Sequence, residues 1–182
     1  MTAIASTDVQ WFLSAPSASA GYTASGTPGA SLGKWMSTTQ VSVTPLDSLF
    51  TDLTAPENSA LQVDYQCLFM MNMTATGWPM QDVNIWIPEP LVTIGGASMA
   101  LGLDPTGVVA YNASVQQAVS IANSLTAPVG VAWYPPTLLY GGPQLGNIAP
   151  NHGIAVWFQR TATDSIAAVD SFNVAAAFQS NA

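Results

Sequence analysis

The sequence predicts an all-β protein: one antiparallel β-sandwich domain, of jelly-roll or immunoglobulin-like type, over residues 1–182. The first reason is the segment 63–87, VDYQCLFMMNMTATGWPMQDVNIWI, in which two apolar stretches alternate with a period of two. That period is typical of β-strands. The second reason is that short apolar stretches recur roughly every 10–15 residues with Gly and Pro turns between them, which favours a sandwich.

Within this central segment the alternation assigns each side chain to one face of a strand. In the first strand it places Tyr65 and Cys67 inward, and it places Leu68 and Met70 outward. In the second strand it places Trp86 outward. Because large apolar side chains on an outward face must be covered, we expect either a second layer or a partner protein over this face.

The N-terminal part predicts a flexible, partly extended arm over residues 1–40. A short apolar stretch at 9–13 is followed by residues 14–33, which are rich in Ser, Ala, Gly, Thr and Pro, a composition typical of flexible segments. Two interpretations remain open: a surface loop, or an arm that becomes ordered against a neighbouring subunit. The candidate interface residues of the whole chain are therefore Leu68, Met70, Trp86, Trp78, Tyr22 and Trp35.

The remaining stretches predict further strands, and two of them are ambiguous. Residues 46–53 carry Leu and Phe at helical spacing and predict one or two helical turns. Residues 108–125 fit a helix in part and alternate in part, and we interpret them as strand-like. DPTG at 104–107 predicts a turn, and residues 141–153 are rich in turn residues. The other predicted strands are residues 40–43, 83–87, 91–94, 98–103, 129–134, 153–161 and 172–178.

The charge balance excludes several classes of partner. The chain has two basic and ten acidic residues, a net charge of −8, and only 7% charged residues where about 25% is usual. A nucleic-acid-binding protein needs several Lys or Arg to neutralise phosphates, and an anionic membrane would repel this chain. We therefore expect no nucleic acid and no membrane as partner. No apolar run is long enough for a transmembrane helix, and the N-terminus lacks the pattern of a signal peptide.

The same composition favours contact with other subunits. Few long charged side chains would lose entropy in an interface, and interface cores are enriched in aromatic residues and Met. The chain has six Trp and seven Met. A buried core is the competing use for these residues, but we expect much of the surface to contact neighbouring subunits.

One short motif raises the question of catalysis. Gly29–Gly33 reads G-x-S-x-G, and Asp104 and His152 follow in the order of an α/β-hydrolase triad. That motif requires a sharp turn between a strand and a helix, whereas here it follows a flexible segment and precedes a non-helical one. We interpret the match as chance and predict that the protein is not an enzyme.

No cofactor or metal ion is predicted. His152 stands alone, and zinc requires several ligands. Asp47, Asp52 and Glu57 could offer oxygen ligands but lack the spacing of a calcium loop, so we expect a solvated acidic edge. Cys67 lies on the inward face and is expected to be a buried, unreactive thiol.

Four residues are predicted to have structural roles: Tyr65, Cys67, Trp157 and Arg160. Arg160 ends the predicted strand GIAVWFQR, and basic residues are scarce here. We expect its guanidinium to form a charge-assisted hydrogen bond to a carboxylate or to carbonyl groups, with its stem packed on the sheet.

Six short motifs follow one another between residues 49 and 160: LF at 49–50, EN at 57–58, YQCLFMMN at 65–72, VNIWI at 83–87, APVGV at 127–131 and GIAVWFQR at 153–160. In this order the motifs resemble those of small virion structural proteins of tailed bacteriophages. Gln66 stands where the family pattern has a basic residue. The motifs concern packing, and residues outside this region are not covered by the resemblance.

The resemblance implies a non-enzymatic virion component. Within that class the resemblance implies a capsid decoration, or cement, protein that binds the major capsid protein on the outer capsid surface and bridges capsomers. It also implies a homo-oligomer, with a trimer favoured. The nearest alternative is a tail, neck or baseplate structural protein of the same virion. Another is a carbohydrate-binding adhesin module, in which Trp78, Trp86, Trp133 or Tyr140 would stack on sugar rings.

Overall fold

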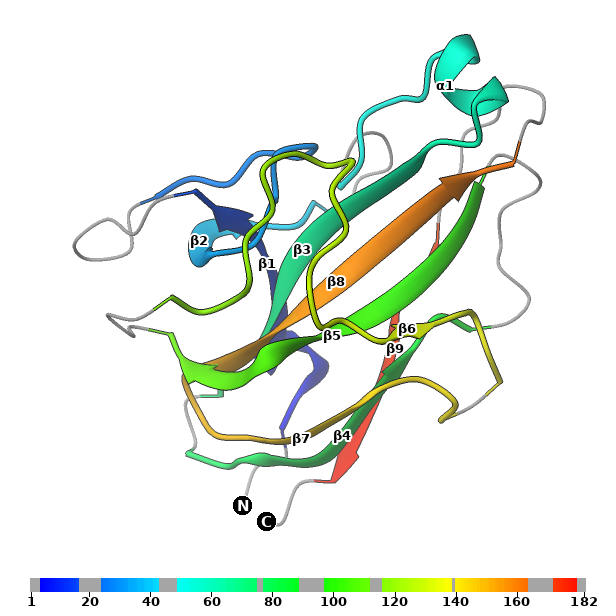
Figure 1. Cartoon of the computed structure of the whole chain (residues 1–182). Helices are drawn as coiled ribbons and strands as arrows, with labels where there is room; N and C mark the ends of the chain where they lie inside the picture. The colour runs from blue at the N-terminus through cyan, green and yellow to red at the C-terminus, as the bar shows by residue number, and fades with distance from the viewer. Residues whose placement is uncertain are drawn as a thin grey trace.

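The structure, a computed structural model, confirms the all-β prediction: two antiparallel sheets pack as a sandwich, shown in Figure 1. The strand order does not identify the sandwich as jelly-roll or immunoglobulin-like. The residues that the structure describes are 4–16, 24–42, 49–74, 77–88, 97–111, 116–138, 140–163 and 172–179.

The larger sheet has six strands among these residues, in the spatial order β2-β1-β3-β8-β5-β6. They are β1 (Val9–Ala15), β2 (Trp35–Gln40), β3 (Val63–Asn72), β5 (Ala97–Ala110), β6 (Trp133–Tyr134) and β8 (His152–Ala162). The smaller sheet has the order β7-β4-β9, with β4 (Met80–Trp86), β7 (Gln144–Ile148) and β9 (Ala175–Gln179). The two strands of segment 63–87, β3 and β4, therefore lie in different sheets and do not pair with each other.

Helical structure in the described residues is limited to a 3-10 turn, η1 (Ser6–Asp8), and one short helix, α1 (Ala55–Ser59). The helix predicted over residues 46–53 is absent from its described part, 49–53, because the residues that cap and begin a helix lie further along the chain. Pro56 is in the first turn of α1, and the Thr54 amide donates to the Glu57 carboxylate at 2.7 Å. Such a capping arrangement fixes the beginning of a helix more strongly than apolar spacing does. Residues 46–48 of the prediction lie outside the described residues.

The main hydrophobic core lies between the two sheets. It contains Leu68 and Met70 from β3, which are 5% and 0% exposed, and it is closed from the other side by the apolar residues of β4 and β7. The prediction that Leu68 and Met70 face outward was therefore wrong, and Trp86 is buried too, at 7% exposure. The smaller sheet is the second layer that covers Leu68 and Met70, whereas Trp86 belongs to β4 of that sheet and packs against Tyr140. Because β3 is buried on both faces, alternation alone did not distinguish core from surface.

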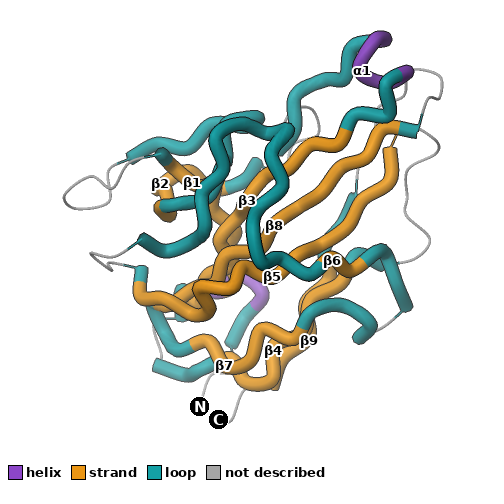
Figure 2. Tube along the Cα trace, viewed as in Figure 1, coloured by secondary structure: helices purple, strands orange, loops and turns teal. Residues whose placement is uncertain are grey.

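A second core covers the opposite face of the larger sheet. Here Tyr65, Cys67 and Trp157 pack with Phe69 and with apolar residues of the connection between β5 and β6. Figures 1 and 2 show this connection crossing over β3 and β8 as a loop. The burial expected for Tyr65 and Cys67 is confirmed, and Trp157 is buried beside them, but their cover is a loop layer rather than a second sheet.

The prediction of a turn at 104–107 was wrong, because these residues form a bulge within β5. The strand continues through these residues, but the register against β8 shifts between Leu103, which pairs with Val156, and Val108, which pairs with Ile154. Extra residues in one strand bend it and re-aim side chains. Here the bulge lets Asp104 reach the second core, where it is 1% exposed.

The prediction of a flexible N-terminal arm was also wrong for the described residues of 1–40, because they belong to the folded domain. β1 pairs with β3, and β2 pairs with β1. Between them Ser31 is fully buried: its amide donates to the Gln66 side chain at 2.9 Å. Ser and Gly suggested flexibility, but small residues are also what a tightly packed loop requires. Residues 17–23 lie outside the described residues.

Several strand boundaries differ from the prediction. Residues 116–125 form a loop with one bridge, Ser120 to Gly33, rather than a strand, and in 129–134 only the last two residues are strand. β2 ends at Gln40, where a strand was expected to begin. β7 was missed because its sequence, QLGNI, is short and polar within a turn-rich stretch. The strand predicted at 91–94 lies outside the described residues.

Gly33 is where the chain before β2 comes closest to the loop layer. Its φ is +81°, which favours glycine, and a Cβ there would collide with the Val119 carbonyl oxygen and lie 2.8 Å from the Trp157 ring. No other residue fits between the loop and the indole. The geometry explains why the second glycine of the G-x-S-x-G pattern is needed for packing.

We predict that Gly33→Ala lowers the free energy of unfolding by more than about 3 kcal/mol, because strain and a backbone collision add. The measurement is urea unfolding followed by Trp fluorescence. Gly107→Ala is the matched control: its φ is +80° with no atom within 4 Å, so only the strain of about 1–2 kcal/mol applies. Equal losses in the two variants would contradict the close approach.

Candidate functional site

The residues of the hydrolase-like pattern do not form a triad. The Ser31 hydroxyl lies in a buried network, where it donates to the Cys67 carbonyl and accepts from the Ser14 amide at 2.7 Å. The His152 ring contacts the Pro150 carbonyl at 2.9 Å, in the turn before β8. Asp104 binds neither of them. The serine is thus occupied as a structural group, with no base beside it to activate it.

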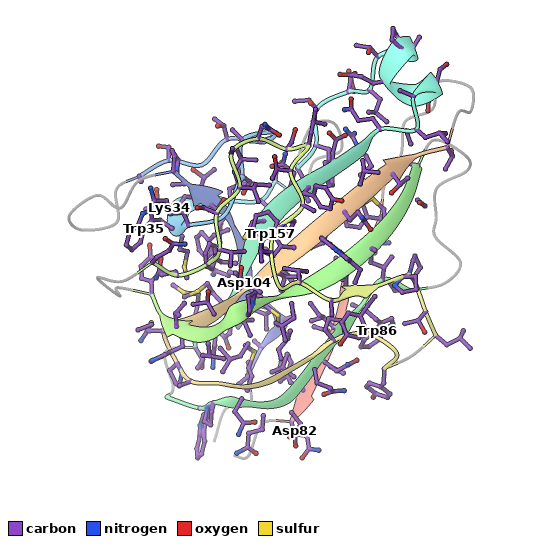
Figure 3. The ribbon with its side chains drawn as sticks, viewed as in Figure 1. Lys34, Trp35, Asp82, Trp86, Asp104 and Trp157 are labelled. Atoms are coloured by element: carbon purple, nitrogen blue, oxygen red, sulfur yellow. The ribbon has the colours of Figure 1, made fainter. Side chains whose placement is uncertain are left out.

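Asp104 instead ties the loop layer to the sheet. One carboxylate oxygen accepts from the Trp157 indole N–H at 2.8 Å and from the Val119 amide at 3.0 Å, and the other accepts from the Thr106 amide at 2.9 Å. Figure 3 shows Asp104 and Trp157 close together at the centre of the molecule. Three donors satisfy a buried carboxylate, so its role is structural.

Cys67 is fully buried in the second core. Burial raises the pKa of its thiol well above the ordinary value, and the negative charge of Asp104 raises this pKa further. Since the reactive form is the thiolate, a raised pKa makes the thiol less reactive.

We predict that iodoacetamide at pH 8 leaves Cys67 of the folded protein unmodified. In urea above the unfolding transition the thiol should react at the rate of an ordinary peptide cysteine, because the burial that raises its pKa is lost. Mass spectrometry of the intact chain gives the extent of modification. Rapid labelling of the native protein would contradict this account of the thiol.

Arg160 has the structural role expected from the sequence. Its guanidinium forms an ion pair with Asp64 at 2.7 Å and donates to the Thr51 carbonyl at 2.8 Å. It also lies over the Phe50 ring, 4.7 Å from the ring centroid. These contacts hold residues 50–51 against the ends of β3 and β8. The partners of the guanidinium group are therefore residues of the same chain.

We predict that Arg160→Met destabilises the protein by about 2–4 kcal/mol, because it leaves the Asp64 carboxylate, which is 5% exposed, without its cation. The double variant Arg160→Met/Asp64→Asn should recover part of this loss, since no buried charge remains. Urea unfolding of wild type, both single variants and the double variant completes the thermodynamic cycle. A double variant as unstable as the sum of the singles would contradict the coupling.

The acidic residues considered for a metal ion do not converge. Among the described residues, no three His, Cys, Asp or Glu side chains lie close enough to hold one. Asp52 is exposed, and Glu57 caps α1, where hydrogen bonds from Thr54 lower the pKa of its carboxyl group. Asp47 lies outside the described residues.

The predicted interface residues fall into three groups. Leu68 and Met70 are buried between the two sheets, and Trp86 is buried on β4 beside Tyr140, so all three have little surface to offer a partner. Trp35 and Trp78 are half-buried, and Tyr22 lies outside the described residues. The aromatic rings considered for sugar stacking are partly covered as well. Trp133 packs against Tyr65 with 5.4 Å between ring centroids, and Trp86 packs against Tyr140 at the same distance.

The exposed apolar surface lies elsewhere, on the loops on either side of β6. We define the β6-flanking loops as residues 116–132, 135–138 and 140–143; Figure 2 shows them as loop on both sides of the short strand. The four most exposed large apolar side chains in the described part of the chain are all here: Val129 at 83%, Leu138 at 72%, Leu125 at 58% and Tyr140 at 57%. The sequence from residue 105 to 159 contains no Asp, Glu, Lys or Arg.

Sequence reasoning noted the charge-free stretch but did not find this surface. It assigned residues 129–134 to a strand, which would have buried half of them, whereas Val129 lies in a turn. A usable signal was present: a long segment with Val, Leu and Tyr and no charged residue must either be buried or present an apolar surface.

The β6-flanking loops are held firmly at several points. The Tyr65 amide donates to the Ser124 carbonyl at 2.7 Å, and the Val119 amide is bound by Asp104. Gly130 lies against Pro105 of the β5 bulge, where an added Cβ would be 3.4 Å from the proline ring. The exposed apolar side chains therefore stand on an ordered support, as in a surface prepared for a partner.

Comparison with known proteins adds no assignment: no family model, no curated protein and no solved structure matches this chain. Among the described residues, none of the helices has the length and apolar character needed to span a bilayer.

Proposed function

We propose that this protein is a non-enzymatic structural component of a bacteriophage virion: a capsid decoration protein that binds the major capsid protein on the outer surface and bridges capsomers. The observation that carries the proposal is the set of exposed apolar side chains on the charge-free β6-flanking loops. The sequence resemblance to small virion proteins supplies the class, and this surface supplies a means of attachment.

The electrostatics of the chain support the outer face of the shell. With a net charge of −8 and two basic residues, of which Arg160 is paired internally, the protein has almost nothing with which to bind packaged DNA. A protein on the outside of the shell does not need such contacts. The trimer that the resemblance implies is part of this proposal.

The neutral loops support attachment by apolar burial. Fully burying an exposed Val or Leu side chain contributes about 1.5–3 kcal/mol, so a few such residues can hold a subunit without ion pairs. Because the loops carry no charge, no ionised group of this surface has to be desolvated when a partner covers it.

Attachment can be tested with one substitution and a matched control. Val129→Asp places a charge at the most exposed apolar position of the loops, and we expect particle binding to weaken by at least about tenfold. Leu61→Asp is the control, because Leu61 is 53% exposed but lies outside the charge-free segment. The readout is co-sedimentation of each purified variant with particles assembled without this chain. If both variants bind as wild type does, the β6-flanking loops are not the attachment surface.

The number of copies per particle distinguishes decoration from the nearest alternative, a tail, neck or baseplate protein, which would use the same kind of apolar surface. Densitometry of purified virions gives this number. A decoration protein should approach the copy number of the capsomers it bridges, whereas a number typical of a tail assembly would overturn the decoration proposal and favour the alternative.

A further inference from the structure

The smaller sheet ends at β9, which pairs with β4 along one edge and with no described strand along the other (Figure 1). The last strand of a sheet presents backbone N–H and C=O groups that can bind a further strand. Proteins usually block such an edge with a charged residue, a proline or a bulge. β9 has none of these: residues 171–182 read SFNVAAAFQSNA, and the extra residue in the β4–β9 pairing belongs to β4.

The core side of β9 is incompletely covered at its centre. Ala176 pairs with Ile85, a fully buried core residue, so both side chains lie on the core side of the smaller sheet. Val174 and Phe178 lie two residues to either side of Ala176, share this face and pack against the main core. Ala176 between them is nevertheless exposed. Solvent therefore reaches the core side of the strand at this position.

The main core also continues to side chains that the smaller sheet covers only in part. Phe172, three residues before β9, and Trp11 of β1 both pack against the ring of Phe158, with 5.7 and 6.1 Å between ring centroids. Phe158 is fully buried, whereas Phe172 and Trp11 are half-buried. The described layer of three strands lies on a layer of six, and an additional strand beside β9 would extend its cover.

We propose that the free edge of β9 pairs with β9 of a second copy of this chain, antiparallel and about a two-fold axis at Ala176. The two smaller sheets then join into one continuous sheet of six strands. On the core side, Val174 lies opposite Phe178 of the partner subunit, and an aromatic residue opposite a β-branched one is a favourable cross-strand pair. On the other side, Ala175 lies opposite Ala177 of the partner subunit. The two-fold axis repeats each pair.

The charge of the chain favours a second copy at this edge. With a net charge of −8, two copies repel each other wherever acidic surfaces meet. None of the ten acidic residues lies in residues 171–182, and every cross-strand pair of the proposed contact is neutral. An exposed strand edge binds another extended strand through main-chain hydrogen bonds, and each copy of the chain supplies that strand.

This contact goes beyond the proposed function and does not rest on it. A two-fold contact doubles the mass of the unit that carries it, whether that unit is a monomer or the proposed trimer. The free full-length protein is therefore sufficient to test the contact, and no virion particle is needed.

The first test is sedimentation equilibrium of the full chain over a concentration series, in which we expect the mass to double. Ala176→Lys places two like charges opposite each other across the axis and should weaken this doubling by at least about tenfold. Ser98→Lys is the matched control, because Ser98 is an exposed residue on β5, a strand of the other sheet. It should double as wild type does. Circular dichroism and thermal unfolding confirm that both variants are folded.

The second test places a cysteine on the axis. The natural Cys67 is fully buried, so in Ala176→Cys the introduced thiol is the accessible one. Opposite residues of an antiparallel pair have Cβ atoms about 4.5–5.5 Å apart, close to what a disulfide spans. Mild oxidation should therefore give a disulfide-linked dimer on a non-reducing gel. Ser98→Cys, oxidised at the same concentration, should give at least about tenfold less.

Three results would overturn the inference. The first is a wild-type mass that does not double at any concentration. The second is doubling that Ala176→Lys leaves as tight as in wild type, and the third is cross-linking of Ala176→Cys no greater than that of Ser98→Cys. Either of these places the contact elsewhere. Because none of the measurements uses particles, their outcome is independent of the co-sedimentation test of the proposed function.

Discussion

The carboxylate of Asp104 is the interaction on which the arrangement of this protein depends. It lies in the bulge of β5 and accepts hydrogen bonds from the Trp157 indole of β8 and from the Val119 amide of the loop layer. A buried carboxylate without these donors would be strongly unfavourable, so the bulge, the strand and the loop must occur together. Gly33 completes the arrangement by letting the chain before β2 pass between the loop and the indole ring.

Asp104 is one example of how the buried polar side chains of this protein are used. Polar side chains are present in the core, but they are used to hold segments together. Gln66 binds the Gly29 carbonyl and the Ser31 amide, and Asn72 binds the carbonyls of Trp78 and Ile148 across the two sheets. Each satisfies backbone groups that a short, irregular loop would otherwise leave unpaired. The buried serine, cysteine and aspartate are part of this same supporting set.

The acidic residues and the most exposed apolar side chains come from different parts of the chain. The acidic residues lie outside the segment from 105 to 159, and that segment supplies the most exposed apolar side chains on loops fastened to the core. The proposed attachment therefore rests on a part of the surface that carries no charged residue.

The sequence by itself determined that the fold is all-β, that Tyr65 and Cys67 are buried, and that Arg160 forms a charge-assisted pair, because these follow from local periodicity and from the scarcity of basic residues. It could not determine which face of β3 meets the second sheet, since both faces are apolar and a period of two looks the same for either. Nor could it distinguish a flexible N-terminal arm from a packed loop: Ser31 and Gly33 suit both until Gln66, Val119 and Trp157 are brought beside them. Contacts between residues distant in sequence decided these points, because burial is a property of the assembled layers.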